Sequence, residues 1–247
     1  MNTTIRLIFA AALLAAAGLA ANAQISVQAG ASLPYQKMTQ HDPSDRYARG
    51  GIGVYAGVDY DIHIIKGFLI TPGLYYSFTQ VSHSEAESGI EMKETQTDHL
   101  ICIPVHLKYA FNIKPDKFGL YLYAGPVFSL SAASRLKGRV NGFEENIDVY
   151  IDNHTGAIKN LEIASLQLSD EEKQTIIDEV QPTLDSQGIT QRHLDLQVDC
   201  GVGFMFRKHW ELRLGYSFGV FDRFNRDYGD NHDLKTMQGY IGFGYRF

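Results

Sequence analysis

The stretch LDLQVDCGVGFMF, residues 194–206, decides the fold, because apolar residues alternate along it with polar or small ones. Successive side chains of a β-strand point to opposite faces, so one face of this strand is apolar along its whole length. The opposite face carries Asp195, Gln197 and Asp199, followed by two glycines. A strand of this kind is typical of a barrel wall that meets lipid on one side.

Seven further segments alternate in the same way, and each is close to or above the roughly 9 to 11 residues that a tilted membrane strand needs. The predicted strands cover residues 25–33, 52–63, 68–78, 101–111, 118–130, 194–206, 210–219 and 237–247. No stretch after residue 23 is apolar over the roughly 20 residues of a membrane helix. Only a closed sheet then pairs every backbone polar group inside a bilayer. The sequence therefore predicts an all-β fold, an eight-stranded antiparallel transmembrane β-barrel.

The lengths of the connections support this fold, because outer-membrane barrels have short periplasmic turns and long external loops. With a periplasmic N-terminus, the predicted short links are residues 64–67, 112–117 and 207–209. The predicted long links are residues 34–51, 79–98, 131–193 and 220–233. Long and short links alternate throughout, which the alternative fold, a soluble β-sandwich, does not require.

The N-terminus has the pattern of a secretory signal, because Arg6 precedes an apolar run that ends in small residues at Ala23. We therefore predict a signal peptide over residues 1–23 and a barrel domain over residues 24–247. This domain includes a long external loop over residues 131–193, and we place the protein in the bacterial outer membrane. The modest net charge of −6 gives no indication of a nucleic-acid partner.

The inward-facing positions of the predicted strands carry balanced charges. An eight-stranded barrel has an interior just wide enough for its own side chains. Three acidic and three basic residues fall in its periplasmic half, namely Asp59, Asp61, Lys108, Glu211, Arg213 and Arg246. Unpaired charges in a narrow, dry space are strongly penalised. We therefore predict that the six residues form a structural charge network that plugs the lumen, and we favour this plug over a proton or ion path.

Two residue types need an explanation within the predicted strands. Pro72, Pro104 and Pro126 lie inside strands, where each removes a donor from the ladder, and we expect local bulges to accommodate them. Cys102 and Cys200 fall on strands that are not neighbours, so we expect free buried thiols and no disulfide between them.

The segment 131–193 contains a helix signal. Ser169-Asp170-Glu171-Glu172 is a capping-box pattern, and it predicts a helix that continues through Val180. Connections of this size are usually functional or disordered. The segment could cap the barrel mouth or hold a protein partner, and a solvated helix without a ligand is the alternative.

Metal and catalytic sites have weaker support. The last loop is rich in oxygen ligands suited to calcium, at Asp222, Asn225, Asp227, Asp230, Asn231 and Asp233. Its spacing lacks the EF-hand glycine and terminal Glu, so we favour solvated turn residues and predict no metal and no cofactor. The pair His83-Ser84 and His99 lie in or beside an external loop, but no third orienting group follows from their spacing. No catalytic residue is therefore predicted.

Two of the strand segments, ICIPVHLKYAF at residues 101–111 and LYLYAGP at residues 120–126, resemble the strand signatures of the PorT-type outer-membrane β-barrel family of Bacteroidetes. The C-terminal GFGYRF resembles the signal that the barrel-assembly machinery reads, with Phe247 at its end. The resemblance implies a barrel surrounded by outer-membrane lipid, and some members of this family are linked to a type IX secretion apparatus.

Together, these features favour a structural or interaction module whose external loops contact a protein partner, in association with a secretion or surface complex. One alternative is an outer-membrane enzyme at the barrel rim, either a protease or a lipid acylhydrolase. The other is a narrow solute channel.

Overall fold

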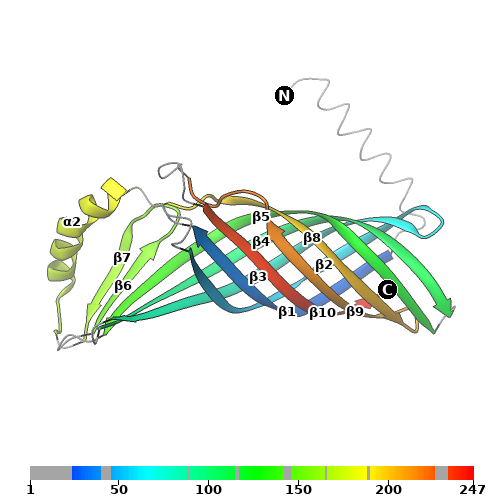
Figure 1. The fold of residues 1–247 in the computed structure, drawn as a ribbon, viewed down its shortest axis with the longest axis horizontal. Coiled ribbons are helices and arrows are strands. Elements are labelled where there is room, and N and C mark those ends of the chain that lie inside the picture. Colours follow the sequence, from blue (N-terminus) through cyan, green and yellow to red (C-terminus); the bar gives the residue numbers. More distant parts are fainter. Residues whose placement is uncertain are drawn as a thin grey trace, which may run out of the picture.

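The computed structural model describes residues 24–39, 46–87, 90–114, 117–141, 146–164, 166–187, 190–225 and 233–247. The ring strands are β1 (Gln24–Thr39), β2 (Arg46–Ile65), β3 (Phe68–Glu87), β4 (Ile90–Lys114), β5 (Phe118–Asn141), β8 (Leu194–Phe206), β9 (Trp210–Gly219) and β10 (Asp233–Arg246). Neighbours follow the order β4-β3-β2-β1-β10-β9-β8-β5, and antiparallel pairing of β4 with β5 closes the ring (Figure 1). The predicted eight-stranded antiparallel barrel is confirmed. The predicted signal peptide, residues 1–23, lies outside the described residues.

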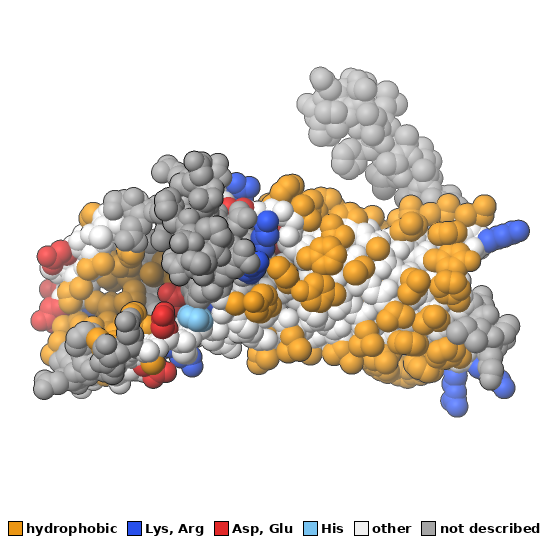
Figure 2. Space-filling model, viewed as in Figure 1, with side chains coloured by type: hydrophobic (Ala, Val, Ile, Leu, Met, Phe, Trp, Pro, Cys, Tyr) orange, Lys and Arg blue, Asp and Glu red, His pale blue; other side chains and the backbone are white. Residues whose placement is uncertain are grey.

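Alternation along the strands gives the barrel an apolar outside and a polar inside. The outward side chains of Ile52 and Phe243 are 68% and 54% exposed, whereas the inward side chains of Gln28 and Glu211 are buried. Figure 2 shows the outward side chains on the visible face as a hydrophobic band across the ring, which we call the hydrophobic belt. No helix in the described part of the chain has the length and apolar character needed to cross a membrane.

One end of the ring carries the short turns, which marks it as the periplasmic end. A two-residue turn joins β2 to β3, and its Gly67 has a φ of +87° that glycine adopts without strain. The turn from β8 to β9 spans three residues, and two of them, Arg207 and Lys208, also have positive φ. Two of the three predicted short links, 64–67 and 207–209, therefore contain the observed turns, whereas β4 continues to Lys114 into the third, 112–117, and residues 115–116 lie outside the described residues.

The strands extend far beyond their predicted ends on the opposite side. The predicted external loops at 34–51 and 79–98 are wrong in extent, because β3 and β4 stay paired from Thr79↔Asp98 to Glu87↔Ile90. Beyond the bilayer the outward face of a strand no longer meets lipid, so its outward positions cease to be apolar while the backbone ladder continues. The change in pattern marks the edge of the membrane, not the end of the strand.

The predicted 131–193 loop is also largely regular structure. After β5 come β6 (Ile147–Asp152), β7 (Ile158–Ile163) and α2 (Asp170–Gln187). β6 pairs with the end of β5, and β7 pairs with β6. The ends of β3, β4 and β5 therefore form, with β6 and β7, a sheet that stands out from the ring at the left of Figure 1. We call it the projecting sheet and define it as residues 79–87, 90–98, 132–141, 147–152 and 158–163.

Helix α2 begins at the predicted capping box. The backbone N–H of Ser169 donates to Glu172 Oε2 at 2.8 Å, and the backbone N–H of Glu172 donates to Ser169 Oγ at 3.3 Å. The bond from the Ser169 N–H also holds the pKa of the Glu172 carboxyl below its ordinary value. The helix continues past the predicted end at Val180 to Gln187 and includes Pro182.

The expected bulges at the prolines are not present. The register is unchanged across Pro72, Pro104 and Pro126, and the ladder instead lacks a few pairs beside Pro72 and Pro104. Pairs on both sides therefore hold the strands in register despite the lost donors. Cys102 and Cys200 are free, but Cys200 is exposed on the outer wall, so the expectation of two buried thiols is wrong for Cys200.

Candidate functional site

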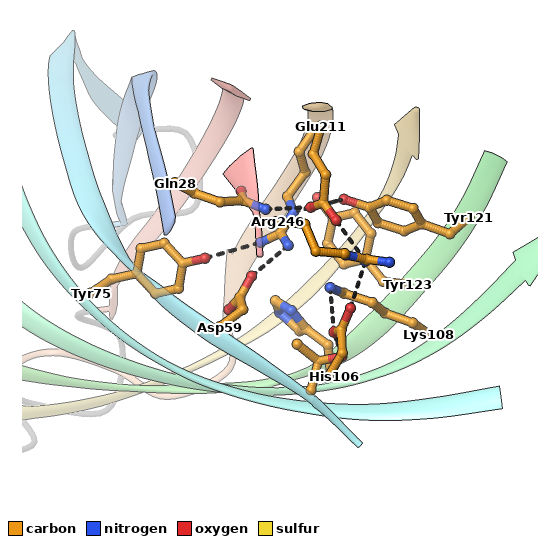
Figure 3. Close-up of polar contacts among 12 residues, drawn as sticks. Gln28, Asp59, Tyr75, His106, Lys108, Tyr121, Tyr123, Glu211 and Arg246 are labelled. Carbon is orange, nitrogen blue, oxygen red and sulfur yellow. Dashed lines mark hydrogen bonds and ion pairs between the residues drawn. The ribbon is translucent and has the colours of Figure 1, made fainter. Parts of the chain in front are cut away.

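The six charged residues predicted for the lumen lie together near its periplasmic end, and we call them the lower polar layer (Figure 3). Asp61 binds two cations: Oδ1 accepts from Lys108 Nζ at 2.9 Å, and Oδ2 accepts from Arg246 Nη2 at 2.6 Å. Arg246 Nη2 also lies 2.6 Å from Glu211 Oε1. Charges from β2, β4, β9 and β10 therefore meet across the barrel axis.

The remaining ion pair of this layer is surrounded by tyrosines. Arg213 Nη2 donates to Asp59 Oδ2 at 2.6 Å. Arg213 also lies within hydrogen-bond distance of the hydroxyls of Tyr75, at 3.3 Å, and Tyr121, at 3.4 Å. The ring of Tyr121 rests on Gly203, where a Cβ would overlap it. Glycine on β8 therefore makes room for the aromatic ring that packs beside the buried charges.

A small cavity of about 70 Å³ lies above the lower polar layer. Its wall includes the rings of Tyr55, Tyr75 and Tyr240, with Tyr55 5.9 Å and 5.7 Å from the other two ring centroids. Asp199 Oδ2 accepts from Tyr240 at 2.7 Å and lies 3.0 Å from His106 Nε2. The cavity is large enough to hold several water molecules.

A second set of buried polar groups lies at the external mouth. Asp98 accepts from Gln96 Nε2 at 3.0 Å, from Arg223 Nη1 at 3.2 Å and from Ser134 Oγ. Gln96 and Gln191 exchange two amide hydrogen bonds of 3.1 Å and 3.2 Å. We call these five residues the upper polar layer. All five are buried, so the layer ties β4, β5 and the segments around residues 191 and 223 across the mouth.

Comparisons with known proteins identify the family of the chain. A family model for the outer membrane protein β-barrel domain matches residues 7–247. The chain belongs to this family. It is therefore a β-barrel protein of the bacterial outer membrane. A comparison with curated protein sequences finds no match.

Several solved outer-membrane proteins are similar to this barrel at low sequence identity. Neisserial surface protein A has 15% identity and a TM-score of 0.42, with 92% of this chain and 99% of that chain covered. The attachment invasion locus protein Ail of Yersinia pestis, in complex with the heparin analogue sucrose octasulfate, has 14% identity and a TM-score of 0.37, with 91% and 99% covered. The outer membrane enzyme PagL has 8% identity and a TM-score of 0.32, with 89% and 97% covered.

Of the two polar layers in this outer-membrane barrel, only the lower one was predicted from the sequence. Gln96 and Asp98 fell in a predicted external loop, although both continue the inward alternation of Pro104, His106 and Lys108 on β4. The inward phase, extended past the end of the apolar belt, was the signal that could have found them. Gln191 and Arg223 lie outside the ring strands, and periodicity gives no sign of them.

The rim histidines of the barrel have no catalytic arrangement at the predicted positions. His83 and Ser84 are neighbours on β3, so their side chains point to opposite faces of the sheet. His99 Nδ1 lies 2.6 Å from the hydroxyl of Tyr76 on the outer surface. The structure does bring Ser131 Oγ, which is buried, within 2.9 Å of His154 Nε2.

The oxygen-rich last loop is described only in part. Asp222 Oδ1 accepts from the backbone N–H groups of Phe224 at 3.1 Å and Leu234 at 2.9 Å, as a turn residue does. The other candidate positions at 227, 230 and 231 lie outside the described residues. Within the described ranges, no group of three or more His, Cys, Asp or Glu side chains is placed to hold a metal ion.

Outside the membrane, the projecting sheet has its own charge cluster. Asp148 on β6 accepts from Arg139 at 2.6 and 2.8 Å and lies 2.8 Å from Lys137 Nζ. The hydrogen bonds from Arg139, together with Lys137, hold the pKa of the Asp148 carboxyl well below its ordinary value. The same contacts raise the pKa of Lys137, to which the hydroxyl of Tyr150 also contributes. The cluster fastens β6 to β5.

Proposed function

We propose that this outer-membrane barrel is a closed membrane anchor that holds the projecting sheet and α2 outside the cell for contact with a protein partner. The observation that carries the proposal is the length of β4, 25 residues, where a membrane strand needs roughly 9 to 11. At about 3.3 Å per residue, the paired residues 90–98 span roughly 30 Å along the strand. A chain that only crossed the membrane has no need for this folded extension.

The two polar layers support an anchor and oppose a solute channel. The charges of the lower layer are balanced and paired, and the side chains of the upper layer are buried against one another. A larger cavity, about 160 Å³, lies next to Lys108 and Arg246 and is walled by His63 and Leu69. The buried ion pairs of Lys108 and Arg246 therefore border this cavity on the side of the lumen.

A deletion experiment tests the recognition role. The full-length protein is expressed in native cells with a photo-crosslinker on a cysteine at Lys159, on β7, at Glu94, on β4, or at Leu33, on the lipid-facing wall, and a second form has residues 136–188 replaced by a short Gly/Ser linker. The free cysteines Cys102 and Cys200 are changed to Ser in both forms. We expect a defined high-mass adduct from the Lys159 position and none from Leu33. The deleted form, tested with a crosslinker at Glu94, should lose partner contact while it keeps the heat-modifiable migration of a folded barrel. An adduct pattern that is the same at both positions would contradict a recognition role.

We further propose that the partner belongs to a secretion or surface complex. The resemblance of residues 101–111 and 120–126 to PorT-type barrels of Bacteroidetes supports a partner in a secretion or surface complex. Adducts that contain secretion components would support this partner, and adducts without them would refute it. We also propose that residues 1–23 are cleaved, so that mass spectrometry of the mature protein should find Gln24 as its first residue.

A further inference from the structure

The two faces of the projecting sheet differ in polarity. Cross-strand pairs place Lys93, Arg139, Asp148 and Glu162 in one row, which forms the polar outer face. The residues that alternate with these along each strand point to the opposite face. This face continues the lumen wall, since Gln96, which lies on it, belongs to the upper polar layer. The sheet is therefore amphipathic, although it stands clear of the hydrophobic belt.

One row of the inner face of the projecting sheet is apolar across four strands, and the next two rows also hold Gly138, Gln96 and Glu94, which is paired with Arg49. Met92 pairs with Val140, Val140 with Ile147, and Ile147 with Ile163, so one unbroken row of apolar side chains crosses β4, β5, β6 and β7. Adjacent rows add the apolar residues Leu136, Val149, Ile151, Ile158 and Leu161. We call this surface the apolar face.

The apolar face is open to solvent in part. Met92 is 51% exposed, and Val140, Ile147 and Ile163 are only half-buried. Figure 2 shows hydrophobic side chains that line a hollow at the end of the molecule carrying β6 and β7. Sheets that stand in water normally bury an apolar face against another layer, so this one is suited to a covering partner.

The margins of the apolar face are acidic. Helix α2 contacts β7, and Ile158 N–H donates to Gln181 Oε1 at 2.8 Å, which fixes the helix beside the sheet. The helix carries six acidic residues and one basic residue, and its acidic side chains are exposed. Across the sheet, the exposed Glu85 pairs with Met92 in the ladder. An apolar strip therefore runs between two negative borders.

We infer that the apolar face binds a cationic amphipathic peptide segment, which lays its apolar side on the row from Met92 to Ile163 and its basic side chains toward α2. The inference rests on the proposed recognition role and names the chemistry of the partner. Helix-in-groove binding of this kind uses an apolar face for affinity and complementary charge for orientation.

Charge also argues against two other partners for the apolar face. A second copy of the chain would bring its own α2, with six acidic residues, toward the first, and like charges in an interface are costly. A lipid headgroup region rich in phosphate would meet the same negative borders. The cationic amphipathic segment is the occupant that satisfies both the apolar face and its margins.

The test uses the full-length protein in nanodiscs of zwitterionic phosphatidylcholine, with empty nanodiscs as the background. The probe is a fluorescein-labelled 14-residue peptide of Leu and Lys, patterned as an amphipathic helix, and the counter-probe replaces every Lys by Glu. We expect saturable binding of the Lys peptide above that of empty discs, and at least tenfold weaker binding of the Glu peptide. Salt should weaken binding because surface charges are screened.

Variants locate the peptide on the apolar face. Met92→Gln changes an exposed side chain of similar size, and Ile147→Thr tests a neighbouring position, so each should weaken binding about fivefold without unfolding the sheet. Asp178→Asn with Glu179→Gln on α2 should also weaken it several-fold. Glu162→Gln, on the polar face, is the matched charge control and should leave binding unchanged. A fold check by amide exchange of residues 147–152 separates lost binding from lost structure.

Three outcomes would overturn the inference: no binding above empty nanodiscs, equal binding of the Glu peptide, or binding that Met92→Gln and Ile147→Thr leave unchanged. A dimer that Met92→Gln dissociates would overturn it as well and would assign the face to a second copy. If the Lys peptide does not bind but the Lys159 position still gives an adduct in cells, the recognition role is supported and the cationic partner is refuted. If neither peptide binding nor the adduct is observed, the recognition role is refuted as well.

Discussion

Asp61 holds Lys108 on one carboxylate oxygen at 2.9 Å and Arg246 on the other at 2.6 Å, with the carboxylate fully buried at 0% exposure. Thr71 donates to the same carboxylate at 2.6 Å. The two cations come from β4 and β10, which are not neighbours in the ring. One acidic side chain of β2 therefore connects separate parts of the wall through the lumen.

Removal of this acid should destabilise the barrel strongly. Asp61→Asn leaves two buried cations with one fewer counter-charge, and breaking a buried pair from one side costs about 3–5 kcal/mol. Urea unfolding in lipid vesicles, followed by the fluorescence of Trp210, measures the change. Glu85→Gln, an exposed change in the same strand system, is the control and should alter stability by less than about 0.5 kcal/mol. An Asp61→Asn barrel as stable as the parent would refute the structural role of the network.

The two polar layers lie one after the other along the lumen, so the intact barrel should not conduct ions. The parent protein in planar bilayers should give no stepwise currents, because buried side chains fill the lumen above and below the 70 Å³ cavity. Arg223→Ala, which opens only the upper layer, should also stay silent. Arg223→Ala combined with alanine at all six residues of the lower polar layer should conduct, provided that heat-modifiable migration shows a folded barrel. Large, stable currents from the parent would defeat the plug and favour the channel.

Two glycines, one in the barrel wall and one in the projecting sheet, should differ in their tolerance of an added methyl group. At Gly203 an added Cβ would overlap the ring of Tyr121, whereas nothing lies within 4 Å of a Cβ at Gly138. Overpacking of this kind costs about 1–3 kcal/mol, so Gly203→Ala should lower the unfolding free energy by that amount. Gly138→Ala should be neutral or slightly stabilising, because glycine weakens a strand. Equal effects at the two sites, measured by urea unfolding, would show that Tyr121 is free to move aside.

The strand core and the lower polar layer follow from side-chain alternation, because within the bilayer each residue must suit either lipid or lumen. This constraint explains why the inward assignment of Lys108 agrees with its burial at 1% exposure. Outside the bilayer the constraint disappears, so the sequence pattern did not predict the continuation of β3 to Glu87 or the pairing of β6 with β5. The contact of Gln96 with Gln191 joins residues 95 positions apart through a non-strand segment, which no periodicity encodes.

The C-terminal residue should affect assembly more than stability. Phe247 is 71% exposed, and its backbone N–H donates to Ile25 O at 3.0 Å, a bond that any residue can make. Phe247→Ala should therefore lower the amount of folded barrel in native outer membranes several-fold, while protein refolded in vitro keeps the parent midpoint in urea. Trp210→Ala, which removes an exposed aromatic residue elsewhere at the same end, is the control for lipid contact. Unchanged membrane levels of Phe247→Ala would contradict the role in assembly-machinery recognition.

The projecting sheet should loosen in acid before the membrane barrel does. The pKa of Asp148 is lowered in the folded protein by Arg139 and Lys137, so the folded state binds its proton less readily than the unfolded state, whose ordinary value is 3.8. The stabilisation is therefore present above pH 3.8 and is lost as the pH falls toward the folded pKa. Hydrogen-exchange mass spectrometry should show protection factors for residues 147–152 that fall between pH 6 and pH 3, by up to roughly fivefold for a partly exposed ion pair.

Asp148→Asn should lower this protection already at pH 6 and remove most of its pH dependence. The remaining part comes from Asp152, whose pKa is also lowered: partial burial raises it, but hydrogen bonds from the backbone N–H groups of His154 and Thr155 outweigh burial. Strand β9, inside the membrane, should keep its protection over the same range and serves as the internal reference. Protection of β6 that is the same at both pH values, in the parent and in Asp148→Asn, would show that the ion pairs of Asp148 do not hold β6 to β5.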